Sequence, residues 1–239
     1  MDTLRRALVV VDVQQEYFAG PLEIEYPPRE DSRTAIVRAV ESAHAAGLPV
    51  VMVQHAGGAG AAVFDPDGDG YPLHPDIAAL RPATGAQPWH DVVKHHGSVY
   101  AGTALADWLR ERGVTTVTLV GYMINNCILA SAVAAEALGF DTEVLADATG
   151  AIPLANDAGT RDAREVHSTL LTLLHSNWAS VANTDGWAAA VTTGTPLSRS
   201  NLVASAVAGR AAGHGARHGA PHGATSEEPP QSSGDGASR

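Results

Sequence analysis

The chain of 239 residues carries a formal net charge of −11, and 45% of its residues are hydrophobic. An acidic protein lacks the basic face that nucleic acid or an anionic membrane requires, so we expect neither as a partner. A single cysteine excludes an internal disulfide. Because the sequence shows no leader of signal-peptide type and no apolar run of about 18 residues, we expect a cytoplasmic protein.

Buried strands are predicted where a continuous apolar run ends at a polar or small residue. Such runs occur at 5–12, 48–55, 89–94, 117–120, 141–146 and 178–182. Helical spacing of apolar residues alternates with them, at 27–46, 102–112, from about 127 onward, at 156–174 and at 184–191. This alternation predicts an α/β domain with parallel strands.

Two stretches lack these patterns. Residues 57–88 are rich in Gly and Pro and are predicted to form a lid or pocket wall. Their DPDGDG run lacks the Glu and the flanking helices of a calcium-binding EF-hand. We expect residues 1–197 to form the domain and 198–239 a disordered tail, in which a repeat spaces His214, His218 and His222 with at most weak metal affinity.

The only cysteine follows a strand and a short turn. The apolar run 117–120 ends at Gly121, and an Ala-rich helix is predicted from about Cys127. A thiol in the first turn of a helix lies near unpaired N–H groups, which favour the thiolate and could hold an oxyanion. The alternative is that Cys127 is a small buried hydrophobic residue, as lone cysteines in intracellular proteins commonly are.

Two other reactive side chains end predicted strands. Asp12 ends the first and Lys94 the third, and ligands of doubly wound sheets bind outside the carboxyl ends of the strands. Lys94 is the one lysine among fifteen basic residues, and unlike Arg it can share or lose its proton. The alternatives are that Asp12 caps the following turn and that the single lysine is a matter of chance.

Several side chains near these strand ends could line a pocket. Tyr17 and Phe18 follow Asp12 closely, and Trp89 and Tyr100 flank Lys94 in the sequence. These residues could build an aromatic wall for a small planar amide, or they could be core or surface residues. His55, which ends the second strand, faces the same crevice or is an ordinary loop histidine.

Three separated motifs occur in order along the chain. They are VVVDVQQEYF with Asp12, Lys94 with the SVYAGTAL that follows it, and GYMINNCILASAVAAEALGFDTEVLADA with Cys127. From about residue 5 to about residue 190 the chain resembles the isochorismatase-like cysteine hydrolases, the superfamily of nicotinamidases, N-carbamoylsarcosine amidase and ureidoacrylate amidases. The resemblance implies a single doubly wound α/β domain, with a six-stranded parallel sheet flanked by helices on both faces, and a catalytic triad of Asp12, Lys94 and Cys127.

The family resemblance also implies a mechanism. The aspartate takes the thiol proton, the lysine keeps aspartate and thiolate ionised, and the thiolate adds to a planar carbonyl. Ammonia or an amine leaves after protonation by the aspartate, and water then cleaves the thioester. A cis peptide precedes the nucleophile in the family and maps here to the Tyr122–Met123 bond. The implied oxyanion donors are therefore the N–H groups of Met123 and Cys127.

The chain departs from the family pattern at two places. Ile124 stands three residues before the cysteine, where family members commonly carry Thr, so the polarity of the substrate is expected to differ. VQHAGG replaces the Asp-x-His of the nicotinamidase metal site, and although His55 and His74 remain, we expect no metal and no other cofactor. The candidate substrate pocket comprises Gln15, Tyr17, Phe18, His55, Trp89, Tyr100, Tyr122 and Ile124.

Together these residues predict a cysteine-dependent amidohydrolase that cleaves an amide or ureido C–N bond of a small molecule through a thioester. We also expect a homo-oligomer. True isochorismatases that cleave a vinyl ether lack the cysteine, so Cys127 favours C–N cleavage. Two alternatives stay open: vinyl-ether hydrolysis or acyl transfer on a biosynthetic intermediate, and a catalytically silent protein that binds a small molecule in the same pocket.

Overall fold

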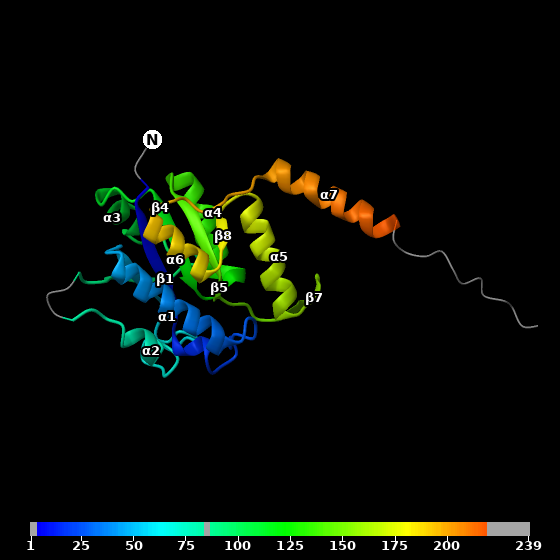
Figure 1. Cartoon of the computed structure of the whole chain (residues 1–239). Helices are drawn as coiled ribbons and strands as arrows, with labels where there is room; N and C mark the ends of the chain where they lie inside the picture. Colours follow the sequence, from blue (N-terminus) through cyan, green and yellow to red (C-terminus); the bar gives the residue numbers. More distant parts are fainter. Residues whose placement is uncertain (1–3, 84–86, 219–239) are drawn as a thin grey trace, which may run out of the picture. The chain divides into compact units, whose positions relative to one another are not determined.

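Strand β1 (Arg6–Val11) lies inside a six-stranded sheet of order β3-β2-β1-β4-β5-β8, in which every neighbouring pair is parallel. The computed structural model describes residues 4–83 and 87–218 (Figure 1). The other strands of this sheet are β2 (Val50–His55), β3 (His90–Lys94), β4 (Thr116–Gly121), β5 (Asp141–Thr149) and β8 (Ser180–Ala182). The predicted parallel sheet is confirmed.

The strand order reverses next to β1. The chain runs outward from β1 to β2 and β3, returns to β4 on the other side of β1, and continues to β5 and β8. In doubly wound sheets of this kind, ligands bind at the carboxyl ends of the strands where the order reverses. Here that position lies between the ends of β1 and β4.

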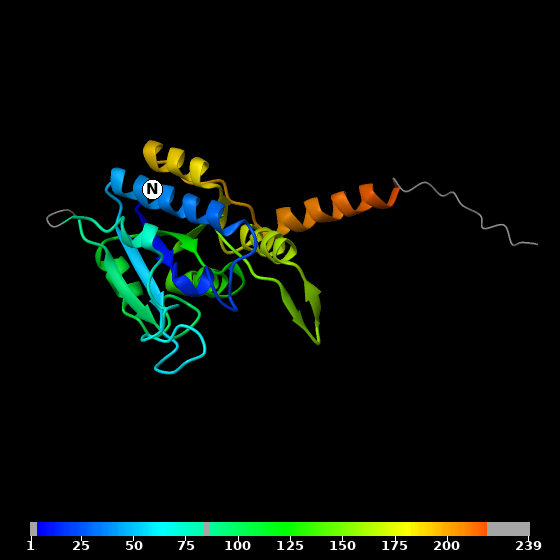
Figure 2. The ribbon, with the colours of Figure 1, turned by 90° about the horizontal axis from the view of Figure 1, so that it is seen from below.

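Helices cover both faces of the sheet, as the family resemblance implies. On one face α1 and α6 lie side by side, and on the other lie α3, α4 and α5 (Figure 2). Their bounds are α1 (Arg29–Ala45), α3 (Leu105–Glu111), α4 (Leu129–Leu138), α5 (Ala163–Ser176) and α6 (Thr184–Thr193).

Strand β1 is buried along its whole length because it contributes side chains to both cores. Successive side chains of a strand point to opposite faces. Leu8 and Val10 therefore join the core beneath α1, whereas Val9 and Val11 join the core beneath α4. This two-sided burial is the reason that the strand reads as an unbroken apolar run.

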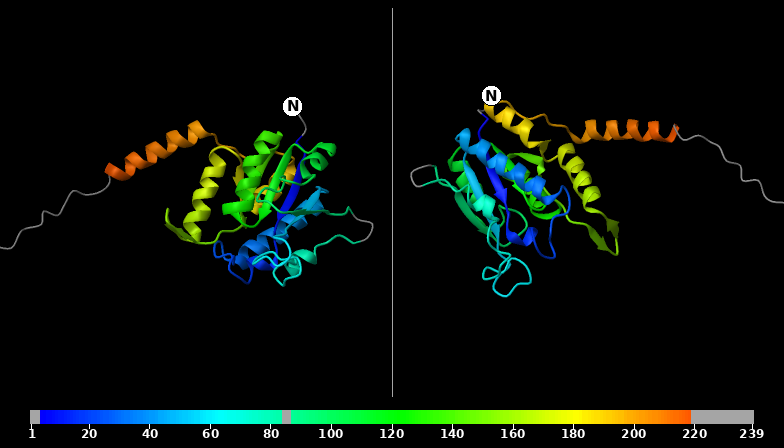
Figure 3. Two further views of the ribbon diagram at one scale, coloured as in Figure 1. Left: turned by 180° about the vertical axis from the view of Figure 1, so that it is seen from behind. Right: turned by 60° about the horizontal axis from the view of Figure 1, so that its bottom comes forward.

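The predicted helix at 156–174 is wrong at its start. Strands β6 (Leu154–Asn156) and β7 (Gly159–Arg161) pair as an antiparallel hairpin that extends from the fold (Figure 3). The helix α5 begins only after Asp162, whose side chain accepts from the Glu165 N–H at 2.8 Å. Apolar spacing gave the helix but not its start, which is marked instead by this capping box.

A helix replaces the disorder expected beyond Ser198. The chain divides into two units, Met1–Leu202 and Val203–Arg239, and α7 (Leu202–His218) is helical. Frequent Ala favours this helix despite the intervening Gly residues, and residues 219–239 of the expected tail lie outside the described residues. His214 and His218 fall within α7, and His222 lies outside the described residues. In the part of the chain that the structure describes, no helix is long and apolar enough to cross a membrane.

Candidate active site

The carboxyl edge of the sheet carries three reactive side chains. Asp12 directly follows β1, Lys94 is the last residue of β3, and Cys127 lies in a short π-helix, η2 (Ile124–Ile128), between β4 and α4. All three are buried, with 0%, 1% and 3% of their surface exposed, respectively. Segments far apart in the sequence thus place a carboxylate, an ammonium and a thiol at the point where the strand order reverses.

Lys94 is the centre of this cluster. Its Nζ lies 2.7 Å from Asp12 Oδ2 and 3.3 Å from Cys127 Sγ. The same Nζ lies 3.0 Å from His55 Nδ1 and donates to the backbone oxygen of His96 at 3.1 Å. The three residues predicted from the strand ends therefore meet, and His55, which pairs with Lys94 in the register of β2 and β3, joins them.

Burial changes the titration of both acids in the cluster. It raises the pKa of Asp12 to about 6, and the positive charge of Lys94 opposes this rise. Burial first, and the negative charge of Asp12 second, raise the pKa of Cys127 to about 12. At neutral pH these shifts favour a carboxylate at Asp12 and a protonated thiol at Cys127.

Burial works against the thiolate that a helix start would favour. Cys127 stands before the first residue of α4, within η2, and Ile124 and Ile128 beside it belong to the same apolar core. The loss of solvation is the largest influence on the thiol and raises its pKa. Formation of the thiolate needs a proton acceptor, and the carboxylate of Asp12, with its raised pKa, is adjacent.

The turn between β4 and η2 explains the sequence around the cysteine. Gly121 has φ of 101°, and a Cβ at this position would lie 2.1 Å from the backbone oxygen of Val11 in β1, so only Gly fits. The peptide bond between Tyr122 and Met123 is cis, as the family resemblance implies. The Met123 N–H donates to no acceptor in the described part of the chain. The backbone thus presents an unpaired donor four residues before Cys127.

Aromatic side chains surround the cluster on the side of η1 (Gln15–Tyr17). Tyr17 is buried and interacts electrostatically with Cys127, and burial raises its pKa. Its ring packs against Phe64 at a centroid distance of 5.4 Å, and Phe64 packs edge-on against His55 at 5.0 Å. The segment 57–88 therefore supplies a wall of the site through Phe64. Of the predicted pocket residues, Tyr17 and His55 lie at the cluster.

Other predicted pocket residues make different contacts. Tyr122 is buried, its hydroxyl lies 2.8 Å from Ser32 Oγ of α1, and its ring packs against Phe18 at 5.7 Å. Ile124 is fully buried in the core. Gln15 is half-buried, and its side chain makes no hydrogen bond within the described residues.

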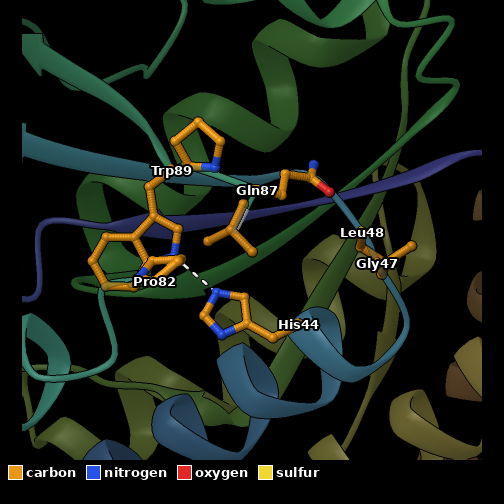
Figure 4. Close-up of a pocket in the computed structure, with 8 residues that line it drawn as sticks. His44, Gly47, Leu48, Pro82, Gln87 and Trp89 are labelled. Carbon is orange, nitrogen blue, oxygen red and sulfur yellow. Dashed lines mark hydrogen bonds between the residues drawn. The ribbon is translucent and has the colours of Figure 1, made fainter. Parts of the chain in front are cut away.

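Two aromatic residues predicted to line the pocket lie elsewhere. Trp89 precedes β3 and so lies at the opposite edge of the sheet from Lys94. Its Nε1 donates to Nε2 of His44 at 2.9 Å, beside a cavity of about 280 Å³ (Figure 4). Tyr100 stacks on Phe140, which precedes β5, at a centroid distance of 6.0 Å. The prediction for Trp89 is wrong because nearness to Lys94 in sequence does not specify an end of the strand, whereas Tyr100 follows Lys94 but packs against Phe140, away from the cluster.

Sequence reasoning missed two polar residues beside the site. Gln14 is fully buried; its Nε2 donates to the backbone oxygens of His55 and Tyr71 at 3.1 and 2.8 Å, and its Oε1 accepts from the His55 N–H at 2.8 Å. Glu16 accepts from the Phe64 N–H at 3.2 Å. Both residues tie the segment 57–88 to the end of β1. The motif contained them, but both lie beyond the end of β1, where strand alternation no longer applies, so their inward orientation could not be predicted.

The histidines near the site could bind a metal only if their ring nitrogens were free. In residues 4–83 and 87–218, no group of three or more His, Cys, Asp or Glu side chains could hold a metal ion. Nδ1 of His74 accepts from the Asp76 N–H at 3.2 Å as the cap of α2 (Pro75–Ala78), and its ring packs on Phe18. His55 is occupied by Lys94. Both histidines therefore have protein partners.

Known proteins are similar to this chain in sequence and fold. Residues 6–185 match the isochorismatase domain family. The crystal structure of an isochorismatase-like protein from Burkholderia xenovorans LB400 has a TM-score of 0.84 at 43% identity, and the match covers 89% of this chain and 99% of that one.

Two further relatives carry names that describe their roles. The secreted isochorismatase effector Isc1 of Verticillium dahliae is 36% identical over 143 residues, which are 60% of this chain and 71% of that protein. The N-carbamoylsarcosine amidase of Thermoplasma acidophilum is 25% identical with a TM-score of 0.58, and the match covers 76% of this chain and 98% of that one. The similarity therefore extends over the sheet and its helices.

Proposed function

Because the chain belongs to the isochorismatase family of hydrolases, we propose that it is a cysteine-dependent amidohydrolase acting on an amide or ureido C–N bond of a small molecule. One observation carries the proposal: Lys94 Nζ contacts both Asp12 at 2.7 Å and Cys127 at 3.3 Å in a buried cluster. A nucleophile, a base and a charge that stabilises the thiolate are the minimum for acyl transfer through sulfur. The likeness to an amidase supports the choice of a C–N bond.

The proposed acylation begins with a proton transfer. The proton of Cys127 Sγ passes to the Asp12 carboxylate, whose raised pKa makes it a stronger base than an ordinary aspartate. The thiolate then adds to the carbonyl carbon, and the carbonyl π electrons move to oxygen. When the C–N bond breaks, the proton on Asp12 goes to the leaving nitrogen, which departs as ammonia or an amine. The product is a thioester on Cys127.

The proposed deacylation uses the same groups in reverse. Asp12 takes a proton from a water molecule, which adds to the thioester carbonyl. The C–S bond breaks, the proton on Asp12 returns to the sulfur, and the acid is released. In both steps the Met123 N–H, which has no acceptor in the described part of the chain, is the proposed donor to the oxyanion together with the Cys127 N–H.

The surroundings of the sulfur support a small, planar substrate. Tyr17, Phe64 and His55 present rings around the cluster, and flat surfaces of this kind favour a planar group such as an amide or a ureido moiety. Ile124 is buried and apolar beside the nucleophile. We therefore propose a substrate that needs no hydroxyl donor at this position.

A panel of small amides and ureido compounds tests the proposal through release of ammonia or amine. The wild-type protein is expected to cleave at least one of them, and Cys127→Ser, purified in parallel, none. If no compound is cleaved but some raise the melting temperature, the chain is a small-molecule-binding protein instead. If a vinyl ether is hydrolysed while all amides resist, the bond type is wrong.

A further inference from the structure

The ammonium of Lys94 has more acceptors than protons to donate. It carries three N–H groups. Four acceptors lie within 3.3 Å of Nζ: Asp12 Oδ2 at 2.7 Å, His55 Nδ1 at 3.0 Å, the backbone oxygen of His96 at 3.1 Å and Cys127 Sγ at 3.3 Å. In the structure the three N–H groups are directed at His55, His96 and Cys127, and Asp12 Oδ2 contacts the ammonium as an ion pair without a hydrogen bond of its own.

Two of these acceptors stay neutral throughout the reaction. The His96 oxygen is a backbone carbonyl. His55 stays neutral at neutral pH, since burial first and the positive charge of Lys94 second lower its pKa to about 4. A neutral His55 whose Nδ1 accepts from Lys94 carries its proton on Nε2. By contrast, Asp12 and Cys127 exchange a proton in the proposed mechanism.

The position of His55 is fixed from two sides. Its backbone N–H and C=O both bind the side-chain amide of Gln14, at 2.8 and 3.1 Å. Its ring packs edge-on against Phe64 with centroids 5.0 Å apart. Since His55 is also opposite Lys94 in the strand register, its Nδ1 is held at a constant place relative to the ammonium.

We propose that His55 is a positioning residue for Lys94, an inference that rests on the amidohydrolase function proposed above. By occupying one N–H it leaves a single N–H, beyond the one held by the His96 carbonyl, that alternates between Asp12 and Cys127. While Asp12 is ionised, its Oδ2 at 2.7 Å from Nζ competes with Sγ for this N–H, and the sulfur remains a thiol. When the proton passes from Sγ to Asp12, the neutral acid becomes the weaker acceptor and the N–H turns to the thiolate.

The alternation couples two events that the reaction needs together. A thiolate forms only when its proton is on Asp12, so that the proton is available for the leaving nitrogen. If a second N–H of Lys94 were free for the sulfur, this coupling would be lost, because the thiolate would then be stabilised while Asp12 is still ionised. The scarcity of N–H groups therefore keeps the proton within the cluster.

Two substitutions distinguish the role of Nδ1 of His55 as a hydrogen-bond acceptor from the packing of its ring. His55→Phe keeps a ring against Phe64 but has no acceptor, which releases one N–H of Lys94 for the sulfur. His55→Asn loses the ring but keeps an acceptor oxygen close to the position of Nδ1. The second variant is thus the matched control for the first.

Alkylation of Cys127 by iodoacetamide across a range of pH is the first measurement, and the label reports one residue because the chain has one cysteine. For His55→Phe we expect alkylation at pH 7 to rise about tenfold over wild type and its pH midpoint to fall by about one unit. For His55→Asn we expect the wild-type profile. An unshifted profile in His55→Phe, or the same shift in both variants, overturns the proposal.

Turnover of an amide identified in the panel is the second measurement. In His55→Phe we expect kcat to fall about tenfold with KM nearly constant, because a proton lost from the sulfur to solvent is no longer on Asp12. The two readouts then move in opposite directions. If alkylation and turnover fall together, His55 acts only through packing, and the proposal is overturned.

The two measurements also separate this inference from the proposed function. A wild-type protein that cleaves amides, with no alkylation shift in His55→Phe, overturns the role of His55 alone. A wild-type protein that cleaves no amide, together with the expected alkylation shift, overturns the amidohydrolase function and leaves the arrangement of donors around Lys94 standing.

Discussion

Strand β1 has a buried ion pair near each end, and the two pairs differ in how fully their charges are satisfied. At the amino end, Arg6 donates to Glu143 from Nε and Nη2 at 2.9 to 3.0 Å, and Nη2 also donates to a backbone oxygen. Glu143 accepts further hydrogen bonds from Thr118 at 2.7 Å and Trp187 at 3.0 Å. Both carboxylate oxygens of Glu143, and Nε and Nη2 of Arg6, therefore have hydrogen-bond partners.

At the carboxyl end, Asp12 is less well satisfied. Its Oδ2 forms the ion pair with Lys94 at 2.7 Å, but neither Oδ1 nor Oδ2 accepts a hydrogen bond from the described residues. Burial accordingly raises its pKa to about 6 despite the nearby ammonium. Lys94, in turn, has too few N–H groups for the acceptors around it. This pair keeps unused hydrogen-bonding capacity next to a thiol.

The difference separates a charge pair that stabilises the fold from one that can exchange protons in the same sheet. Fixed charges with saturated hydrogen bonds resist any change of protonation, so the amino-end pair can hold β1, β4, β5 and α6 together but cannot exchange protons. An under-satisfied carboxylate with a pKa near neutrality is suited to exchange them. The following changes test this assignment, from the largest expected effect on turnover to the smallest.

Replacement of the nucleophile is expected to have the largest effect. Cys127→Ser should lower turnover by on the order of a thousandfold or more, because the hydroxyl is a far weaker acid and nucleophile than the thiol. The fold should persist, since the substitution is nearly isosteric. Steady-state kinetics and circular dichroism measure both quantities. A folded variant that keeps more than a few per cent of wild-type activity would remove Cys127 from the mechanism.

Lys94→Arg is expected to be the next most severe change, although it conserves charge. The acceptors converge on one nitrogen at 2.7 to 3.3 Å, and a longer, planar guanidinium cannot reproduce this arrangement. Displacement of reacting groups by about an ångström can cost roughly a hundredfold in rate. We expect a loss of that order and an altered pH profile of Cys127 alkylation. Near wild-type turnover would show that the ammonium has no special geometry.

The sequence predicted the carboxyl end of β1 better than its surroundings. Asp12, Lys94 and Cys127 were found because each follows an apolar run, and parallel strands bring such ends to one edge. The role of Gln14 depends on its orientation beyond the end of β1, and that of His55 on the register of β2 and β3, and no periodicity in the sequence encodes either. Trp89 was misplaced because the ends of a strand look alike in composition. The raised pKa of the Cys127 thiol could not be predicted from the sequence, because it depends on burial in three dimensions.

The acid side of the pH profile tests Asp12 itself. Its carboxylate must be ionised to accept the thiol proton, and its pKa is about 6, so the group protonates as the pH falls through that value. We expect kcat/KM to decrease about tenfold per pH unit below about pH 6. Circular dichroism at pH 5 serves as the control for folding. A rate that stays constant from pH 7 to pH 5 would contradict Asp12 as the base.

Glu143→Gln is expected to leave turnover nearly unchanged while it weakens the fold, because it acts at the amino end of β1. Removing one charge of a buried pair leaves Arg6 uncompensated and typically costs about 3–5 kcal/mol. In a domain of this size the melting temperature should fall by roughly 10 °C. Asp141→Asn is the matched control, since its pair with Arg199 at 2.7 Å is exposed and should contribute less than about 1 kcal/mol. If Glu143→Gln, assayed well below its melting temperature, loses turnover as severely as Lys94→Arg, the two ends of β1 are coupled and the division between structural and chemical charge pairs does not hold.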